Sequence, residues 1–265
     1  MMVDFLLDSS HFIISGALVG LLVGMTGVGG GSLMTPLLTL IFGVTPTTAV
    51  GTDLAFAAIT KGFGTVAHRL HGNVRWDIVQ LLCIGSISTA ILSILFLKYA
   101  GPVSKDWNQL ISISIGISVL LTASSLLFRA KILEWVQDNH RYLPKGLTLK
   151  ISTISVGAAI GILVTISSIG AGAIGATLIL LLYPHLKASE VAGTDIAYAV
   201  PLTALAGLGH WWLGNVHFDL LFGLLLGSVP AIWLGAKLSS TLSERATRTA
   251  LAGTLFLVGI KLVSS

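Results

Sequence analysis

An internal repeat is the feature of this chain that most limits its fold. Residues 50–57 read Val-Gly-Thr-Asp-Leu-Ala-Phe-Ala, and residues 192–199, 142 positions later, read Ala-Gly-Thr-Asp-Ile-Ala-Tyr-Ala. Three polar residues recur at the same spacing, since His68, Asn73 and Asp77 return as His210, Asn215 and Asp219. An apolar chain built from two such halves is typical of membrane transporters whose substrate site lies between the halves.

Composition defines the environment of the chain. Apolar residues make up 54% of it and charged residues 10%, whereas charged residues are about a quarter of a soluble domain. We therefore predict an integral membrane protein with the lipid bilayer as a partner. The single cysteine, Cys83, excludes an intramolecular disulfide. We interpret the net charge of +4 as an orientation signal and not as affinity for nucleic acid.

Apolar segments separated by polar or Gly/Pro breaks predict an all-α fold with two repeats. The first repeat covers residues 1–128, the second covers 148–265, and the polar segment 129–147 links them. Each repeat begins with a helix pair and continues with three transmembrane helices. The predicted pairs are residues 11–43 and 148–183, and the predicted transmembrane helices are 47–67, 77–98, 108–128, 188–209, 218–238 and 247–263.

The helix pair that opens the chain permits two topologies. Residues 11–26 and 30–43 each span about 22 Å as a helix, which is less than a hydrocarbon core of about 30 Å. Either the pair is one broken helix that crosses the membrane once, or it is a re-entrant hairpin that turns at its glycines.

The positive-inside rule favours the hairpin. With a hairpin in each repeat, eleven Lys and Arg residues share one side of the membrane and three lie on the other, whereas a single crossing divides them eight to six. The three are Lys98, Lys105 and Lys261. The hairpin places the linker in the cytoplasm and both termini outside. It also makes the repeats inverted, because each then has an odd number of full crossings.

The two hairpin tips are the predicted substrate site. Backbone that leaves a helix inside the membrane must line a cavity or be buried in protein, and free N–H groups at a helix N-terminus attract an anion. Neither tip contains an acidic residue. The predicted substrate-binding residues here are Thr26, Gly27, Gly29, Gly30, Gly31 and Ser32, with Ser167, Ser168, Gly170 and Gly172 in the second tip. The alternative is that the glycines only permit close helix crossings.

Three ionisable residues lie deep within predicted helices, where charges are rare and usually functional. Asp53 and Asp195 are repeat mates. Each either couples a proton to transport, or pins the opposing hairpin by accepting hydrogen bonds from its backbone. Lys61 has no mate, because its counterpart is Thr203. Lys61 either supplies a positive charge for the anion, adding it to the substrate-binding residues, or extends to the cytoplasmic boundary.

A turn motif closes one helix and opens the next in both repeats. It contains His68 and Asn73 in the first repeat, and His210 and Asn215 in the second. In an inverted arrangement the two histidines lie at opposite mouths of the protein, so these residues are candidates for gating or proton relay. The alternative is that the Gly-Asn pairs form tight turns and that the histidines bond to backbone.

Enzyme signatures are weak in this chain. The glycine-rich segment 27–32 lacks the Lys-Ser/Thr ending of a nucleotide-binding loop, and the histidines lack metal-ligand spacing. We therefore expect no enzyme activity, no cofactor and no metal. Any energy coupling must come from an ion gradient or a partner.

The motifs resemble those of the sulfite exporter TauE/SafE family of membrane transporters. The resemblance rests on residues 27–38, 46–52 and 68–76 and covers nearly the whole chain. It implies transport of sulfur-containing anions such as sulfite, sulfoacetate, other organosulfonates and thiosulfate. It also adds Thr52, and its repeat mate Thr194, to the predicted substrate-binding residues. Many members carry serine after this threonine, where this chain has aspartate in both repeats.

Together these patterns predict a secondary carrier in the inner (plasma) membrane. It exports a small sulfur-containing anion, such as sulfite or sulfoacetate, by alternating access between inverted repeats. The sequence leaves proton coupling and a homo-oligomeric state open. The alternatives are a passive anion channel, an importer of thiosulfate or a related oxyanion, and a membrane scaffold or enzyme subunit.

Overall fold

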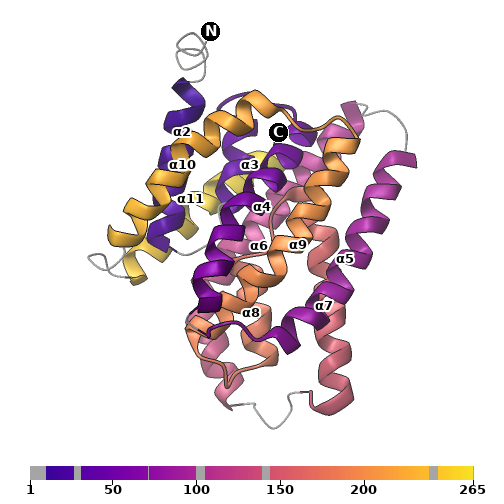
Figure 1. The fold of residues 1–265 in the computed structure, drawn as a ribbon, viewed down its shortest axis with the longest axis vertical. Coiled ribbons are helices and arrows are strands. Elements are labelled where there is room, and N and C mark those ends of the chain that lie inside the picture. The colour runs from indigo at the N-terminus through magenta and orange to yellow at the C-terminus, as the bar shows by residue number, and fades with distance from the viewer. Residues whose placement is uncertain are drawn as a thin grey trace.

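A computed structural model describes residues 10–26, 31–70, 72–99, 105–138, 144–238 and 244–264. Within these residues all regular structure is α-helical, which confirms the predicted all-α class (Figure 1). The helices of the first half are α2 (Ser10–Thr26), α3 (Gly31–Leu40), α4 (Pro46–Leu70), α5 (Trp76–Tyr99) and α6 (Lys105–Asp138). Those of the second half are α7 (Gly146–Ser167), α8 (Ala173–Leu182), α9 (Ala188–Trp212), α10 (Phe218–Leu238) and α11 (Glu244–Ser264).

Five helices among the described residues are long and apolar enough to cross a membrane. These segments are Trp76–Tyr99, Trp107–Arg129, Gly146–Ser167, Ala188–Trp212 and Phe218–Gly235. The chain is therefore a multi-pass membrane protein, as its composition predicts. We predicted that residues 47–67 and 247–263 also cross the membrane. They are outside these five segments, so their crossing stays a prediction. In the first of these, Asp53 and Lys61 interrupt the apolar sequence.

The helix pairs that open the two halves differ in length. α2 and α3 have 17 and 10 residues, whereas α7 and α8 have 22 and 10. α7 is thus long enough to span a membrane by itself, a length not expected for the first helix of a re-entrant hairpin. It ends where Ser168 adopts the left-handed conformation with a φ of 60°.

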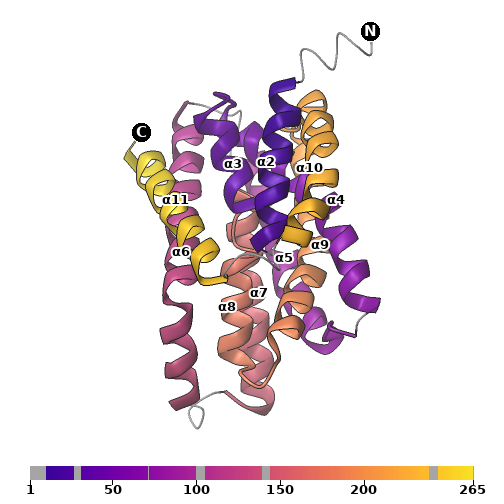
Figure 2. The ribbon, with the colours of Figure 1, turned by 90° about the vertical axis from the view of Figure 1, so that its left-hand side faces the viewer.

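Both helix pairs turn back on themselves. The rings of Phe12, near the start of α2, and Phe42, just after α3, have centroids 5.3 Å apart. The hydroxyl groups of Thr153, in the first half of α7, and Tyr183, directly after α8, are 2.7 Å apart. The second helix of each pair therefore returns alongside the first. Figure 2 shows α2 and α3 in the upper half of the molecule and α7 and α8 in the lower half.

The two halves exchange packing partners. α2 packs along α10, and α7 packs along α5, so the first helix of each half lies against the fourth helix of the other. A Cβ atom at Gly227 would overlap the carbonyl oxygen of Ile13, and one at Gly85 would overlap that of Ile154. Close backbone approach of this kind is a main source of attraction between helices in lipid.

α4 and α9 pack antiparallel in the core of the bundle. Gly51, near the start of α4, contacts the carbonyl group of Asn215, just after the end of α9. Gly193, near the start of α9, contacts the carbonyl group of Asn73, just after the end of α4. A side chain at either glycine would overlap these carbonyl groups. The Gly-Thr segment of each half therefore lies against the turn of the other half.

We expect Gly227→Val to destabilise the fold, because the new side chain would push α10 away from the backbone of Ile13. Overpacking of this kind costs about 1–3 kcal/mol, which lowers the melting temperature by roughly 5 °C in a chain of this size. Gly253→Val in α11 is the matched control, because a Cβ atom there meets no atom within 4 Å. Thermal unfolding in detergent measures the difference, and equal melting temperatures would contradict the α2–α10 contact.

Candidate functional site

Three charged side chains are buried where α4 and α9 meet. Asp53 on α4 is 0% exposed, Asp195 on α9 is 4% exposed, and Lys61 on α4 is 9% exposed. Ionisable groups inside a membrane protein are costly, so they usually have a functional role. We call these three residues the charged cluster.

Lys61 connects the two halves of the chain. Its Nζ donates a hydrogen bond of 3.0 Å to the carbonyl oxygen of Ala171, in the tip of the second hairpin. It also interacts electrostatically with Asp195 and, to a smaller extent, with Asp53. The ammonium group therefore points into the protein and does not extend to the cytoplasmic boundary, which was one of the two alternatives for this residue.

Asp53 lies between the two hairpins. Its Oδ2 accepts a hydrogen bond of 2.5 Å from the hydroxyl group of Thr35 on α3. The Ser168 hydroxyl group, in the second tip, also acts on the carboxyl group. Asp53 Oδ1 and Ser168 Oγ have no hydrogen-bond partner among the described residues, and the same holds for Asp195 Oδ1 and the Tyr198 hydroxyl oxygen. Because buried polar atoms are normally hydrogen-bonded, the surroundings of both aspartates could accept a further polar group.

Asp195 faces the start of α8. Its carboxyl group interacts with the backbone N–H of Gly172 and with the hydroxyl group of Tyr198. Its Oδ1 lies so close to Gly175 that a Cβ atom there would overlap it. One of the two alternatives for the aspartates placed each against the opposing hairpin, whereas Asp195 contacts the hairpin of its own half. The reason is that α8 packs directly on α9.

Buried serines and glycines form the tip of the second hairpin. The Ser167 hydroxyl group donates a hydrogen bond of 2.7 Å to the carbonyl oxygen of Leu163 and accepts one of 3.2 Å from the N–H of Ile169. Gly170 and Gly172 have φ values of 135° and 137°, which side-chain-bearing residues rarely adopt. Ser167 therefore holds the backbone of the tip, and the two glycines permit its turn.

The first hairpin tip is described in part. α2 ends at Thr26, α3 begins at Gly31, and Ser32 is buried. The three other predicted residues of this tip, Gly27, Gly29 and Gly30, lie outside the described residues. Thr35, one turn further along α3, bonds to Asp53 of the charged cluster.

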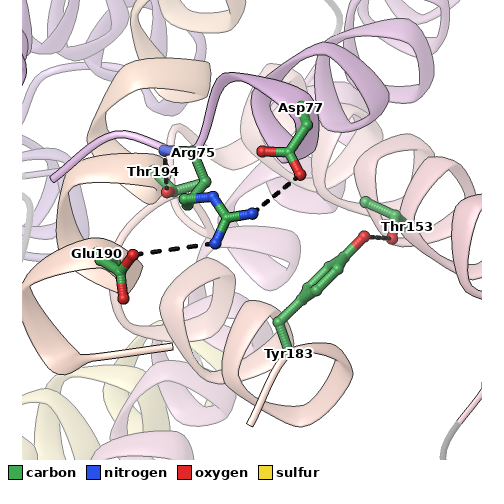
Figure 3. Close-up of polar contacts among 6 residues, drawn as sticks. All are labelled: Arg75, Asp77, Thr153, Tyr183, Glu190 and Thr194. Carbon is green, nitrogen blue, oxygen red and sulfur yellow. Dashed lines mark hydrogen bonds and ion pairs between the residues drawn. The ribbon is translucent and has the colours of Figure 1, made fainter. Parts of the chain in front are cut away.

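Thr52 and Thr194 bond to the turns of the opposite halves. The Thr52 hydroxyl group accepts a hydrogen bond of 3.1 Å from the backbone N–H of His217. The Thr194 hydroxyl group accepts one of 3.1 Å from the backbone N–H of Arg75 (Figure 3). These two predicted substrate-binding hydroxyl groups therefore secure contacts between the halves in this conformation.

The turn-motif residues lie at opposite ends of the α4–α9 pair. His210 is buried, and its Nε2 is 2.9 Å from the carbonyl oxygen of Thr165 near the end of α7. The side-chain amide nitrogen of Asn215 is 3.5 Å from His210 Nδ1. His68, at the other end of the pair, is partly buried. The bonding of His210 to backbone matches the second alternative given for the histidines above.

Sequence reasoning missed two side chains with hydroxyl groups that contact the charged cluster. Tyr198 follows Asp195 by three positions and so lies on the same face of α9, which is a signal that could have identified it. Thr35 is a polar residue in an apolar helix and recurs as Thr177 in the second half. The two threonines differ in their bonding, because the Thr177 hydroxyl group lies 2.6 Å from that of Ser125.

An exposed ion-pair network lies beside the first turn motif. The guanidinium group of Arg75 is 3.3 Å from Asp77 and 3.9 Å from Glu190 at the start of α9 (Figure 3). In the internal repeat, Arg75 of the first half corresponds to His217 of the second half. Glu190 of the second half corresponds to Thr48 of the first half. The ion pair between halves therefore has no counterpart at this position of the second turn.

A separate cleft of about 400 Å³ opens between α4, α9 and the start of α10. Its lining includes Ala58, Ile59, Leu208 and Trp211 and contains no charged side chain. An anion would lose its hydration there without gaining a partner. The cleft is therefore a poor candidate for an anion site.

Comparisons with known proteins agree with the resemblance. The profile of the sulfite exporter TauE/SafE family matches residues 12–262. The chain is 36% identical over 255 residues to YjnA of Bacillus subtilis, covering 96% of this chain and all of the relative. It is 28% identical to YdhB of the same organism, covering 93% and 96%. Both relatives are named probable membrane transporter proteins. No solved structure is a significant match to the chain.

We expect Thr194→Val to weaken the contact between the halves, because valine has the shape of threonine but leaves the Arg75 N–H without its acceptor. An unpaired polar group of this kind costs about 1–3 kcal/mol. Thr194→Ser keeps the acceptor and is the matched control. Thermal unfolding in detergent separates the two variants, and a serine variant as unstable as the valine variant would assign the effect to lost packing.

Proposed function

The chain belongs to the sulfite exporter TauE/SafE family, and from this premise we propose that it is a secondary transporter that exports a small sulfur-containing anion such as sulfite or sulfoacetate. The observation that carries the proposal is Lys61, a buried cation bonded to the tip of the second hairpin. A transporter role follows from the family and from the names of its relatives. We propose that the charged cluster serves transport and not an enzyme reaction.

The groups around Lys61 suit a small oxyanion. The ammonium group of Lys61 supplies positive charge beside the N-terminus of α8, where the Gly172 N–H faces Asp195. The unpaired hydroxyl group of Ser168 adds a donor. An oxyanion that displaces the Ala171 carbonyl group from Lys61 would accept hydrogen bonds from all three.

Alternating access between inverted repeats is the mechanism that we propose. The antiparallel course of the repeat mates α4 and α9 supports it, as does the position of the two hairpins in opposite halves of the molecule. In this conformation the charged cluster is shut off from solvent. Opening to either side requires one of the two turn contacts, at Thr52 or at Thr194, to separate.

For the orientation we propose the inner (plasma) membrane, with the 129–147 linker in the cytoplasm and both termini outside. The distribution of Lys and Arg supports this orientation. We also propose that transport is coupled to protons. The charged cluster carries two carboxyl groups against one ammonium group, so an incoming anion meets excess negative charge unless a carboxyl group binds a proton.

Flux into proteoliposomes tests the transport proposal with sulfite, thiosulfate, sulfoacetate, taurine and chloride. We expect saturable exchange of a labelled sulfur-containing anion for the unlabelled one. A passive channel would show no exchange and would ignore a proton gradient, and an importer would accumulate thiosulfate or another oxyanion from outside.

We expect Gly172→Leu to reduce sulfoacetate exchange at least about tenfold, because the left-handed φ of 137° does not accept leucine and the Asp195 contact would be lost. Gly30→Leu in the first tip is expected to act in the same way. Gly253→Leu is the control, since that position is open. Native exchange rates in both correctly inserted tip variants would contradict the site assignment.

A further inference from the structure

We propose that the apolar cleft between α4, α9 and the start of α10 binds an acyl chain of one membrane phospholipid. The cleft has a volume of about 400 Å³ and contains no residue of the charged cluster. The residues that carry the argument are Ala58, Ile59, Ala204, Leu208, Trp211 and Phe218. The proposed function leaves this cleft unused, so the assignment goes beyond it and does not depend on the transported anion.

The lining of the cleft suits a hydrocarbon chain. Every residue that lines it is apolar, and none carries a charge, a hydroxyl group or an amide side chain. Sites for polar small molecules hold a few placed polar groups among apolar ones, and this lining offers none of them. A hydrocarbon chain needs no such partner and gains dispersion contacts with the walls.

The cleft is continuous with the surface that the bundle presents to lipid. Ile59, Leu208 and Phe218 line the cleft and are exposed at its opening. Phe63 on α4 and Phe222 on α10 follow Ile59 and Phe218 by four positions, on the same helix faces, and are exposed as well. Lipid chains surround such a surface in a multi-pass membrane protein, so they have direct access to the cleft.

Cation–aromatic pairs mark the membrane boundaries at the two ends of α5. The Arg69 guanidinium carbon lies 5.9 Å from the ring centroid of Trp76, and Lys98 Nζ lies 3.5 Å from that of Trp212. Tryptophan is enriched at membrane–water interfaces, where long basic side chains also reach the head groups. The helix rises about 33 Å between Trp76 and Lys98, which matches a hydrocarbon core of about 30 Å. Both pairs therefore lie at the level of the phospholipid head groups.

The cleft extends inward from the head-group level at the Lys98 end. Trp211, at its outer end, precedes Trp212 in the sequence, and Ala204 lies two turns deeper along α9, a rise of about 10 Å. The exposed ammonium group of Lys98 offers positive charge to a lipid phosphate at this level. A phospholipid with its phosphate beside Lys98 can therefore place part of one chain in the cleft.

The two halves of the chain differ at this position. The rings of Trp211 and Phe218 pack edge to face, with centroids 6.1 Å apart. Their counterparts in the first half are Arg69 and Trp76. A cation thus stands in the first half where an aromatic ring forms the cleft wall in the second, so the apolar wall is a feature of the second copy.

A helix from a second copy of the chain does not fit the cleft. A helix is about 10 Å across, so a length of about 10 Å fills roughly 800 Å³. This is twice the volume of the cleft. A single hydrocarbon chain is thinner than a helix and matches the space better.

A chain in the cleft also supports a contact between the two halves. Val216 and Phe218 line the cleft on either side of His217, whose backbone N–H donates a hydrogen bond of 3.1 Å to the Thr52 hydroxyl group. The bound chain packs against α4 and against both neighbours of His217. Because a ligand favours the conformation that it binds, the phospholipid stabilises this contact.

Photolabelling locates the site in the purified protein. The probe is phosphatidylglycerol with a diazirine in the middle of one acyl chain, added in limiting amount to detergent micelles. We expect saturable labelling of residues 55–59 and 204–218. Labelling that is confined to other surfaces, or that rises in proportion to the lipid without saturation, would overturn the proposal.

Variants that fill the cleft test the same site. Ala204→Phe and Ala58→Phe should each lower the saturable labelling at least about tenfold, because the ring occupies the space of the lipid chain. Gly253→Phe is the control, since a Cβ atom at this exposed position of α11 meets no atom within 4 Å. Lys98→Gln should weaken labelling without moving it. Equal labelling in Lys98→Gln would overturn the position given to the head group, and full labelling in both filled variants would overturn the site.

Native mass spectrometry and thermal unfolding identify the occupant. We expect one retained phosphatidylglycerol per chain, absent in the filled variants. The lipid should raise the melting temperature of the unmodified protein and of Gly253→Phe by roughly 5 °C, and leave that of Ala204→Phe unchanged. A protein dimer that the filled variants dissociate would show that a second copy occupies the cleft, and the proposal would be wrong. If a filled variant does not fold, the position of the label in the unmodified protein decides. No transported anion enters these measurements, so their failure and a failure of the transport proposal are distinguishable.

Discussion

The burial of one ammonium group and two carboxyl groups in an apolar bundle is the constraint on which the rest of the structure depends. A regular helix uses its own N–H and C=O groups, so only helix ends and broken segments can offer backbone partners to a buried charge. Lys61 bonds to the carbonyl oxygen of Ala171, and Asp195 faces the N–H of Gly172, both in the tip of the second hairpin. The hairpin that ends inside the bundle is therefore required by the charges that α4 and α9 bring there.

Glycine contacts make this arrangement possible, because they bring polar backbone from one half against the other. Lipid provides no hydrophobic drive for helices to associate, so close packing and interhelical hydrogen bonds must hold the bundle together. Gly51 and Gly193 let each turn approach closely enough for the neighbouring threonine hydroxyl group to accept a backbone hydrogen bond. The same residues thus stabilise this conformation and form the two contacts that the alternating access proposed above would have to break.

The composition predicted the helical membrane class, because a bilayer enforces local apolar patterns, and the motifs at residues 27–38, 46–52 and 68–76 predicted the family. The same patterns placed Asp53, Asp195 and Lys61 inside helices. They did not reveal which groups these side chains meet, since the Lys61–Ala171 contact joins residues 110 positions apart. Nor did they indicate that Asp195 faces its own hairpin, which depends on how α8 packs against α9. Contacts between distant segments depend on tertiary packing, and local sequence patterns do not reveal which segments pack together.

The differences between the two copies carry the chemistry that the duplication alone would not supply. Two identical halves would place a lysine on both α4 and α9, yet Thr203 stands opposite Lys61 in the repeat and bonds to the carbonyl oxygen of Ala199 in its own helix. Lys61, the cation of the charged cluster, lies on α4 of the first half and donates its hydrogen bond to Ala171 of the second half. Any rotation of one half against the other therefore changes the distance between Lys61 and the tip at Ala171. If the proposed anion binds between them, its contacts change with that movement, so in the proposed mechanism the Lys61–Ala171 hydrogen bond would connect substrate binding to the conformational step.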